Sequence, residues 1–385
     1  MRIDLTSRQT ALPLGLLWLA AIAVGLVGVT QRLLNGHEQA DYGSYIPWGL
    51  WVGMYIFLAG LSAGLFLVAS LDLLLKLKVF AGTARTLLLA ALASLAAGLL
   101  FIWIDLGHPE RVYRVYTDPN FNSVMAQIVW AYTAFGALTL LTLVLHVRKA
   151  SDTLLSIVVA VGIPLALFLS SAVGALLGVA AARPFWHVGL FPVQFPVFSV
   201  ASAVAMLMVL IAFVGPKEDS QRRQLLWILA ITSISLQVVK LFFLWADLSQ
   251  SYYGGAPQNQ DAIEALVSGN YWWAFWVLQI LIGSVIPILI LFQPRLARRP
   301  AWAFTAGIAI LFGLVVARMN ILLPALVVPQ LTGLEDAYVN PHLSLEYFPS
   351  VMEWQVFVFI LALAVGGFLA VYRLLPVLSR EEADT

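Results

Sequence analysis

The chain has 385 residues, of which 61% are hydrophobic and 11% are charged, and its formal net charge is +1. Soluble domains carry about 25% charged residues, so this composition excludes an ordinary soluble globule, and the small net charge gives no general attraction to nucleic acid. The absence of cysteine excludes disulfides, thiolate zinc sites and cysteine-ligated iron–sulfur clusters within this sequence.

Ten apolar stretches are long enough to cross about 30 Å of hydrocarbon as helices. We therefore expect an all-α integral membrane protein in a lipid bilayer. Arg2 and Arg8 precede the first stretch, but that stretch is too long for a signal peptide and no A-x-A site follows it, so we expect it to be retained. The expected spans are 12–34, 48–75, 84–106, 124–147, 154–181, 195–214, 225–246, 271–292, 302–323 and 351–372.

Basic residues are concentrated on one side of the expected spans, in every second connection. Most of the 21 Lys and Arg residues lie at the two ends of the chain or in the short connections after even-numbered spans. The positive-inside rule then predicts that both termini are cytoplasmic. The opposite, outward connections are long, aromatic and mostly acidic, and long loops gathered on one face usually carry function. These connections are 35–47, 107–123, 182–194, 247–270 and 324–350.

Small residues form a stripe on the second span. A stripe with almost no side chain lets a neighbouring backbone approach closely. We expect helix packing here, and pocket building is the alternative. The residues are Gly49, Gly53, Gly60 and Gly64.

The five histidines all lie away from the middle of a span. A b-type haem inside a bundle needs axial ligands on facing helices, and this sequence offers no such pair at membrane depth. Four of them fall on the outward side, near Asp105, Arg111 and Arg183, which favours a cluster that handles protons or contacts a quinone. The four are His37, His108, His187 and His342.

Ionisable residues inside spans are costly and are functional candidates. Lys240 and Asp247 are seven residues apart and share a helix face. With Arg318 and Glu353 they are candidates for a buried ion network across three helices, which would act either as an interhelical clamp or as a proton path or quinone pocket. Asp72 lies near the cytoplasmic end of the second span and is a candidate for the place where protons enter.

Six segments in chain order carry a family resemblance. They are YIPWGLWVGMYIFLAGLSAG at 45–64, DLGHPERVY at 105–113, FNSVMAQ at 121–127, ARPFWHVGLFPVQF at 182–195, ARMN at 317–320 and YFPSVMEW at 347–354. Together they resemble the NrfD/PsrC family of quinone-interacting membrane subunits over nearly the whole chain. Ten spans are similar to the branch that includes HybB-type hydrogenase subunits, DsrP-type subunits and the integral subunits of alternative complex III.

This resemblance implies a fold as well as a site. The single membrane domain 1–385 would hold two four-helix bundles, 48–181 and 195–323, with flanking helices 12–34 and 351–372. A quinone site would lie near the outward surface in the first bundle. There an Asp or His can take a proton from quinol, and an arginine suits an anionic form of the ring. The implied site residues are Trp48, Asp105, His108, Gln127, Tyr132, Arg183 and His187.

The resemblance further implies a function in a bacterial or archaeal cytoplasmic membrane. Members exchange electrons between menaquinone or ubiquinone and the iron–sulfur clusters of a ferredoxin-like subunit on the periplasmic face, without a haem or cluster of their own. That subunit is linked to a catalytic molybdopterin, hydrogenase or multihaem cytochrome subunit. Proton translocation is a further possibility that the relationship raises.

Two alternative functions stay open from the sequence. A secondary transporter would suit ten helices, Pro164 and Pro287 inside spans, and the buried charges. However, no convincing pair of broken helices stands at equivalent positions. A passive anchor for a peripheral enzyme is the other alternative, and the buried charges count against it.

Overall fold

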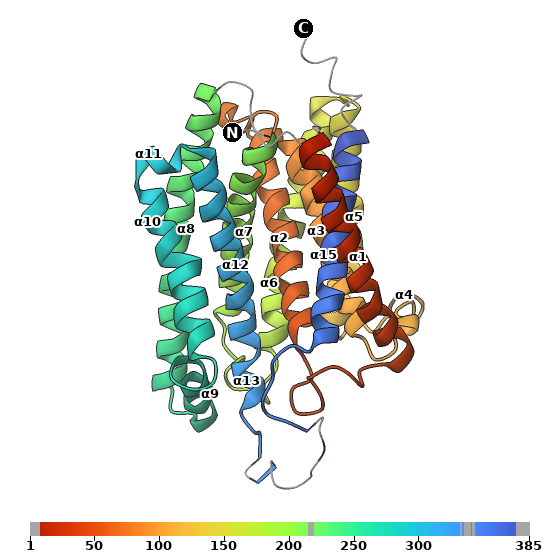
Figure 1. Ribbon diagram of the computed structural model, residues 1–385, viewed down its shortest axis with the longest axis vertical. Helices are drawn as coiled ribbons and strands as arrows, with labels where there is room; N and C mark the ends of the chain where they lie inside the picture. The colour runs from red at the N-terminus through yellow and green to blue at the C-terminus, as the bar shows by residue number, and fades with distance from the viewer. Residues whose placement is uncertain (1–7, 215–218, 332, 335–339, 341–342, 375–385) are drawn as a thin grey trace.

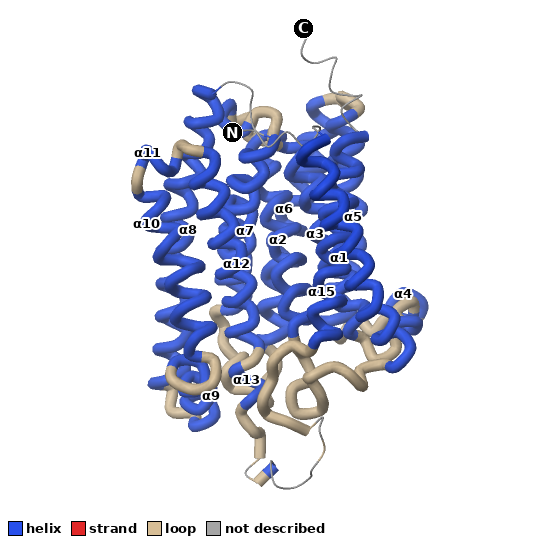
Figure 2. Tube along the Cα trace, in the orientation of Figure 1, coloured by secondary structure: helices blue, strands red, loops and turns tan. Residues whose placement is uncertain are grey.

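The computed structural model describes residues 8–214, 219–331, 333–334, 340 and 343–374 (Figure 1). Within these residues ten helices are long and apolar enough to cross a membrane, and no strand is present (Figure 2). The all-α membrane fold and the count of ten spans are therefore confirmed. His342 lies outside the described residues.

The long helices follow the expected spans closely. They are α1 (Arg8–Asn35), α2 (Leu50–Leu73), α3 (Ala84–Asp105), α5 (Val124–Val147), α6 (Asp152–Gly178), α7 (Phe191–Val214), α8 (Asp219–Tyr253), the π-helix η3 (Ala274–Val285) continuing as α10 (Ile286–Phe292), α12 (Pro300–Leu322) and α15 (Val351–Leu374). The largest difference is at α8, which extends beyond the expected 225–246 at both ends. Hydropathy marks only the part of a helix inside hydrocarbon, so it missed the polar turns outside.

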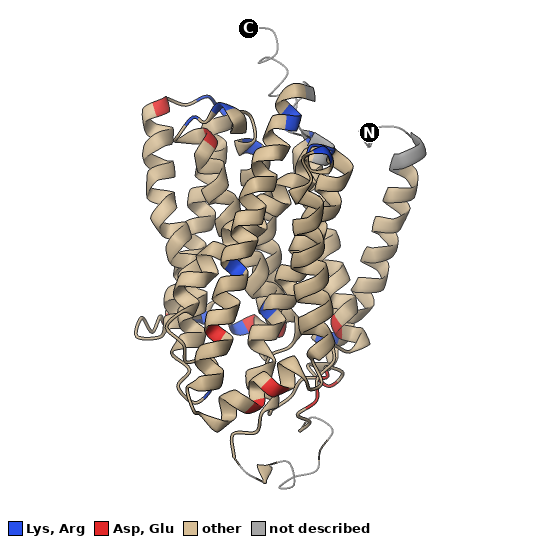
Figure 3. Ribbon diagram, turned by 90° about the vertical axis from the view of Figure 1, so that its left-hand side faces the viewer, with Lys and Arg blue, Asp and Glu red and all other residues tan. Residues whose placement is uncertain are grey.

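Short helices and loops distinguish the two ends of the molecule (Figure 2). We call the end that carries α4 (Arg114–Thr117), α9 (Pro257–Val267), α13 (Pro324–Val327) and residues 36–49 the loop end. The opposite end, where α1 begins and α15 ends, is the terminal end (Figure 1). Most basic residues drawn in Figure 3 lie toward the terminal end, whereas acidic residues are more numerous at the loop end. The charge asymmetry of the sequence is thus an asymmetry between two faces.

Helix α2 lies at the centre and is almost entirely buried. It packs against α3, α6, α7 and α12. A Cβ at Gly53 would overlap the sulfur of Met319 on α12, and one at Gly64 would overlap the Ser199 carbonyl on α7. These glycines therefore permit the close approach of α2 to the helices of the second half of the chain.

The contacts divide the remaining helices into groups around α2. α5 packs on α3 and α6, whereas α12 packs on α7 and η3, and α8 packs on α7 and α10. This grouping is consistent with the two four-helix bundles that the resemblance implies. Because α2 packs heavily on members of both groups, the division into bundles stays a prediction.

Helices α1 and α15 flank the other helices as a pair (Figure 1). Gly25 and Gly28 of α1 lie against Phe359 and Gln355 of α15, and Trp18 Nε1 donates to the Ala362 carbonyl at 2.8 Å. Most other side chains of α1 are exposed and apolar, as a lipid-facing helix requires.

Helix η3 has π-helical geometry up to a proline. Pro287 has no N–H to offer the Gly283 carbonyl four residues earlier. The side chain of Gln237 on α8 donates to that carbonyl instead, at 3.1 Å. π-Helical geometry is rare and often marks functional sites, and the 12 residues of η3 place Gln279 and Ser284 in the protein interior.

Candidate functional site

A buried polar cluster surrounds the end of α3 at the loop end of the molecule. The last carbonyls of a helix lack intrahelical donors. Arg32 Nη2 of α1 donates to the Leu106 carbonyl at 2.6 Å, and His37 Nε2 donates to the Asp105 carbonyl at 3.0 Å. The ring of Tyr42 lies 5.3 Å from that of His37. We call Arg32, His37, Tyr42 and Asp105 the α3-end cluster.

Three polar atoms of the α3-end cluster are buried and make no hydrogen bond of standard geometry within the described residues. They are Arg32 Nε, Tyr42 Oη and Asp105 Oδ1. The Tyr42 hydroxyl and the Asp105 carboxyl are nevertheless close enough to interact with each other. Buried polar atoms are nearly always hydrogen-bonded in proteins. The cluster therefore offers donors and an acceptor that a bound molecule can satisfy.

Protonation states of the cluster follow from burial and charge. Burial, with the nearby charge of Arg32, lowers the pKa of His37, so its neutral form is favoured. Because Nε2–H is the donor to Asp105, the neutral ring keeps Nδ1 as a free acceptor. Burial and the neighbouring carboxyl of Asp105 raise the pKa of Tyr42, which keeps its phenol protonated and able to donate.

Glu353 and Tyr347 hold the surrounding chain in place. Glu353 is 0% exposed and accepts from Tyr347 Oη at 2.6 Å, Ser350 N at 2.9 Å and Asp41 N at 3.1 Å. Tyr347 Oη in turn accepts from Leu50 N, the first residue of α2, at 2.7 Å. The carboxylate thus joins α15, α2 and residues 36–49 beside the α3-end cluster.

Two tyrosines face each other between α2 and α5. The ring centroids of Tyr55 on α2 and Tyr132 on α5 lie 5.9 Å apart, edge to face. Both are buried and their hydroxyls interact with each other, although Tyr132 Oη makes no hydrogen bond of standard geometry among the described residues. Tyr132 was a sequence candidate, whereas Tyr55 was missed.

Trp48 stacks on Trp186, with ring centroids 5.4 Å apart and an interplanar angle of 17°. Trp186 Nε1 donates to the Ile321 carbonyl at 2.8 Å. This predicted residue therefore lies at the seam between the start of α2 and the end of α12.

Two other predicted residues lie away from the buried cluster. His108 is largely exposed and pairs with Glu110, Nδ1 to Oε1 3.0 Å. Gln127 is also exposed, and its Nε2 donates to the Phe121 carbonyl at 2.7 Å. Proximity to Asp105 in the sequence does not bring His108 to it in space, because the chain turns outward after α3.

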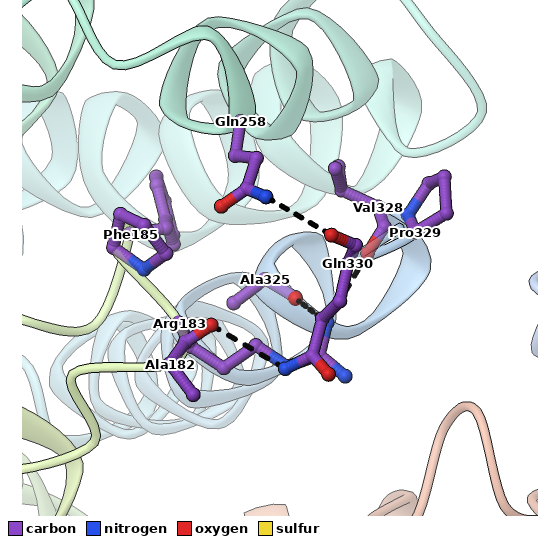
Figure 4. A pocket seen from close by; sticks show the side chains of 9 residues that line it. Ala182, Arg183, Phe185, Gln258, Ala325, Val328, Pro329 and Gln330 are labelled. Atoms are coloured by element: carbon purple, nitrogen blue, oxygen red, sulfur yellow. Dashed lines mark hydrogen bonds between the residues drawn. The ribbon is translucent and has the colours of Figure 1, made fainter. Parts of the chain in front are cut away.

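Arg183 and His187 hold the α6–α7 connection. Arg183 Nη1 donates to the carbonyls of Ala325 at 2.8 Å and Val328 at 3.1 Å (Figure 4). Burial lowers the pKa of Arg183. The adjoining cavity is about 10 Å³, too small for an organic ring. His187 is exposed, and its Nδ1 donates to the Gly178 carbonyl at 2.7 Å.

The predicted ionisable residues inside the spans do not form one ionic network. All four are described, and no ion pair joins any two of Lys240, Asp247, Arg318 and Glu353. Lys240 Nζ donates to Ser284 Oγ at 2.8 Å. The guanidinium carbon of Arg318 lies 3.8 Å from the ring centre of Phe195, which is a cation–π contact.

Asp72 has a local partner at the terminal end. Its Oδ2 accepts from Ala84 N at 3.0 Å. That N–H opens α3 and would otherwise lack an intrahelical acceptor. The carboxylate therefore caps a helix.

Fold and site together define a multi-pass, all-α membrane protein with acid–base side chains buried at one end. The chain belongs to the family described as polysulphide reductase, NrfD, whose model matches residues 38–330. The ten apolar helices and this family membership place it in a bacterial or archaeal cytoplasmic membrane. The match spans α2 to α13 and includes Tyr42 and Asp105.

Relatives in this family are subunits of several reductases. The chain is 29% identical to a selenate reductase subunit from Mesobacillus selenatarsenatis, over 93% of this protein and 92% of the relative. It is 23% identical to the integral membrane subunit of menaquinone reductase of Nitratidesulfovibrio vulgaris, over 95% and 92%. A polysulfide reductase subunit from Wolinella succinogenes is 24% identical, over 64% and 83%.

Proposed function

We propose that this chain is the quinone-reactive membrane subunit of a multisubunit respiratory oxidoreductase. The observation that carries the proposal is the α3-end cluster, in which Asp105 Oδ1, Tyr42 Oη and Arg32 Nε are buried without a hydrogen bond of standard geometry among the described residues. The relatives named for menaquinone reductase and polysulfide reductase support it.

The α3-end cluster fits a quinone head group chemically. Each quinone oxygen accepts hydrogen bonds in the oxidised form and donates one in the reduced form. Tyr42 Oη and Arg32 Nε are donors, and Asp105 Oδ1 is an acceptor. These residues suit both forms. Tyr132 stays a candidate for contact with the ring because its buried hydroxyl makes no hydrogen bond of standard geometry among the described residues.

When bound, a quinone supplies two-electron, two-proton redox chemistry. Asp105 acts as the proton acceptor through Oδ1, and neutral His37 holds an acceptor at Nδ1. Arg32 anchors the end of α3 and places positive charge beside the carboxylate. Glu353 and Tyr347 hold the start of α2 and residues 36–49 in position.

The electrons need a carrier in another subunit, because the sequence has no cysteine to ligate a cluster. We infer that both termini are cytoplasmic and that the loop end faces the periplasm. The basic residues at the terminal end support this orientation (Figure 3). A ferredoxin-like iron–sulfur subunit would then dock at the loop end and link this chain to a catalytic molybdopterin, hydrogenase or multihaem cytochrome subunit.

Proton translocation is a second function that one observation favours. Lys240 is 1% exposed and Asp247 is 5% exposed, and neither has an ion partner among the described residues. Buried ionisable groups in a membrane interior are typical of proton relays.

Two matched carboxylate variants test the quinone proposal. The complex is purified with its partner subunits, and quinone-linked turnover, bound quinone and iron–sulfur EPR signals are measured. Asp105→Asn should abolish turnover with the complex intact. Asp118→Asn changes an exposed carboxylate at the same end and should leave turnover unchanged. Full turnover in an assembled Asp105→Asn complex would overturn the site.

A further inference from the structure

A small cavity lies between α7, α8, α9, η3 and α12, away from the α3-end cluster. Its volume is about 20 Å³. Its lining is mainly apolar but contains Gln194, Lys240, Asp247, Gln279 and Asn320. Two ionisable side chains at this depth are unusual because the surrounding solvent is hydrocarbon.

Neither charged side chain of the lining has a full set of hydrogen-bond partners among the described residues. Lys240 has three N–H donors, and within the described residues its one hydrogen bond is to Ser284 Oγ, at 2.8 Å. Asp247 is 5% exposed, and its Oδ1 is buried without a partner. The two residues are two helical turns apart, about 10 Å along α8, and both reach the same cavity.

The side-chain amides of Asn320 and Gln279 are hydrogen-bonded to each other. Asn320 Nδ2 donates to Gln279 Oε1 at 2.6 Å. Ser284 Oγ, which accepts from Lys240, donates to the Gln279 carbonyl at 3.0 Å. These hydrogen bonds tie η3 to α12 and to its own backbone, while Asp247 Oδ1 has no hydrogen-bond partner among the described residues.

The volume of the cavity suits water and excludes an organic ring. A cavity needs about 10–15 Å³ to hold one water, and a buried water makes two to four hydrogen bonds to polar groups. An organic ring does not fit in about 20 Å³. An unsolvated charge in the protein interior is costly, so the two ionisable side chains of the lining favour water in a cavity of this size.

We propose that this cavity is an internal hydration site, in which one or two water molecules solvate Lys240 and Asp247. Leu266 of α9 and Phe185 of the α6–α7 connection belong to the lining and come from the loop end, so the cavity lies toward that end. The proposal stands whether or not the α3-end cluster binds a quinone.

Hydroxyl-radical footprinting by X-ray radiolysis tests this site in the intact complex in lipid nanodiscs. Radicals form from water in place and oxidise adjacent side chains, which mass spectrometry then reads. The matched pair is Phe198, which lines the cavity and is 5% exposed, and Phe135, which is 0% exposed and lies outside it. Phe198 should be oxidised several-fold faster. Equal, slow oxidation of both rings would overturn the proposal.

Two variants show where the oxidising water lies. Leu244→Phe adds volume to the cavity wall, and Asp247→Leu removes the unpartnered carboxylate. Either should slow oxidation of Phe198 while leaving Phe135 unchanged, so one suffices if the other fails to fold. Undiminished oxidation of Phe198 in a folded variant would place the water elsewhere and overturn the assignment. Neither readout depends on quinone turnover.

Discussion

Tyr347 donates its phenol proton to Glu353 Oε1 at 2.6 Å and accepts from Leu50 N at 2.7 Å. Both bonds are buried, and burial, with the charge of Glu353, raises the pKa of Tyr347, which keeps the phenol protonated. One hydroxyl therefore satisfies a carboxylate and the first N–H of α2 at the same time.

Tyr347→Phe should destabilise the protein by about 1–3 kcal/mol, because it leaves the buried Glu353 carboxylate and Leu50 N–H each without this partner. The apparent melting temperature in detergent measures the loss. Tyr253→Phe is the control, since Tyr253 is 83% exposed. Equal melting temperatures for the two variants would show that the Tyr347 hydroxyl contributes nothing.

His37 should make stability fall in mild acid. Its pKa in the folded protein lies below the ordinary value, so between these two pKa values the unfolded chain binds more protons than the folded one. Stability is full above about pH 6.5 and declines as pH falls toward the lower folded pKa. Melting temperatures measured from about pH 8 to 5 should fall less for His37→Gln than for the parent.

Other groups also titrate in this range, so the difference between parent and variant is the quantity to follow. A matched His108→Gln variant changes an exposed ring and should follow the parent curve. If His37→Gln also follows the parent, protonation of His37 is not coupled to folding.

The ten spans were predictable because hydrocarbon imposes a length and an apolar composition on every spanning helix. The α3-end cluster was harder to find. Asp105 was predicted from its motif, but Tyr42 and Tyr347 reach the site from loops whose return path no local pattern encodes. Arg32 could have been predicted as a member of the cluster, because it is a basic residue at the outward end of the first span.

The exposure of two candidates has a physical explanation. His108 lies just after the end of α3 and Gln127 lies in the first turn of α5, and both side chains are exposed. The four ionisable residues inside the spans form no ion pair with one another for a different reason. Equal depth along a helix does not fix which way a side chain faces, and Arg318 faces the rings of Phe195 and Phe198.

Arg318→Lys should destabilise the protein although it keeps the charge. The guanidinium of Arg318 lies over Phe195 at 3.8 Å and Phe198 at 5.1 Å. An ammonium keeps a cation–π attraction but cannot stack its plane on a ring, so the variant loses part of a contact that is worth up to about 2 kcal/mol when desolvated. Arg111→Lys is the exposed control. A melting temperature unchanged by Arg318→Lys would show that the two rings do not distinguish the cations.

Gly64→Ala should be among the most damaging single-methyl changes in the protein. The added Cβ would overlap the backbone carbonyl of Ser199 on α7, and a backbone atom cannot rotate away as a side chain does. Separating α2 from α7 costs about 1–3 kcal/mol. Gly15→Ala in α1 is the matched control, because nothing lies within 4 Å of its new methyl group. Alanine is favoured over glycine in a helix by about 1 kcal/mol, so Gly15→Ala should leave the melting temperature unchanged or raise it. If Gly64→Ala behaves in the same way, α2 and α7 are farther apart than described, and the central position of α2 would need revision.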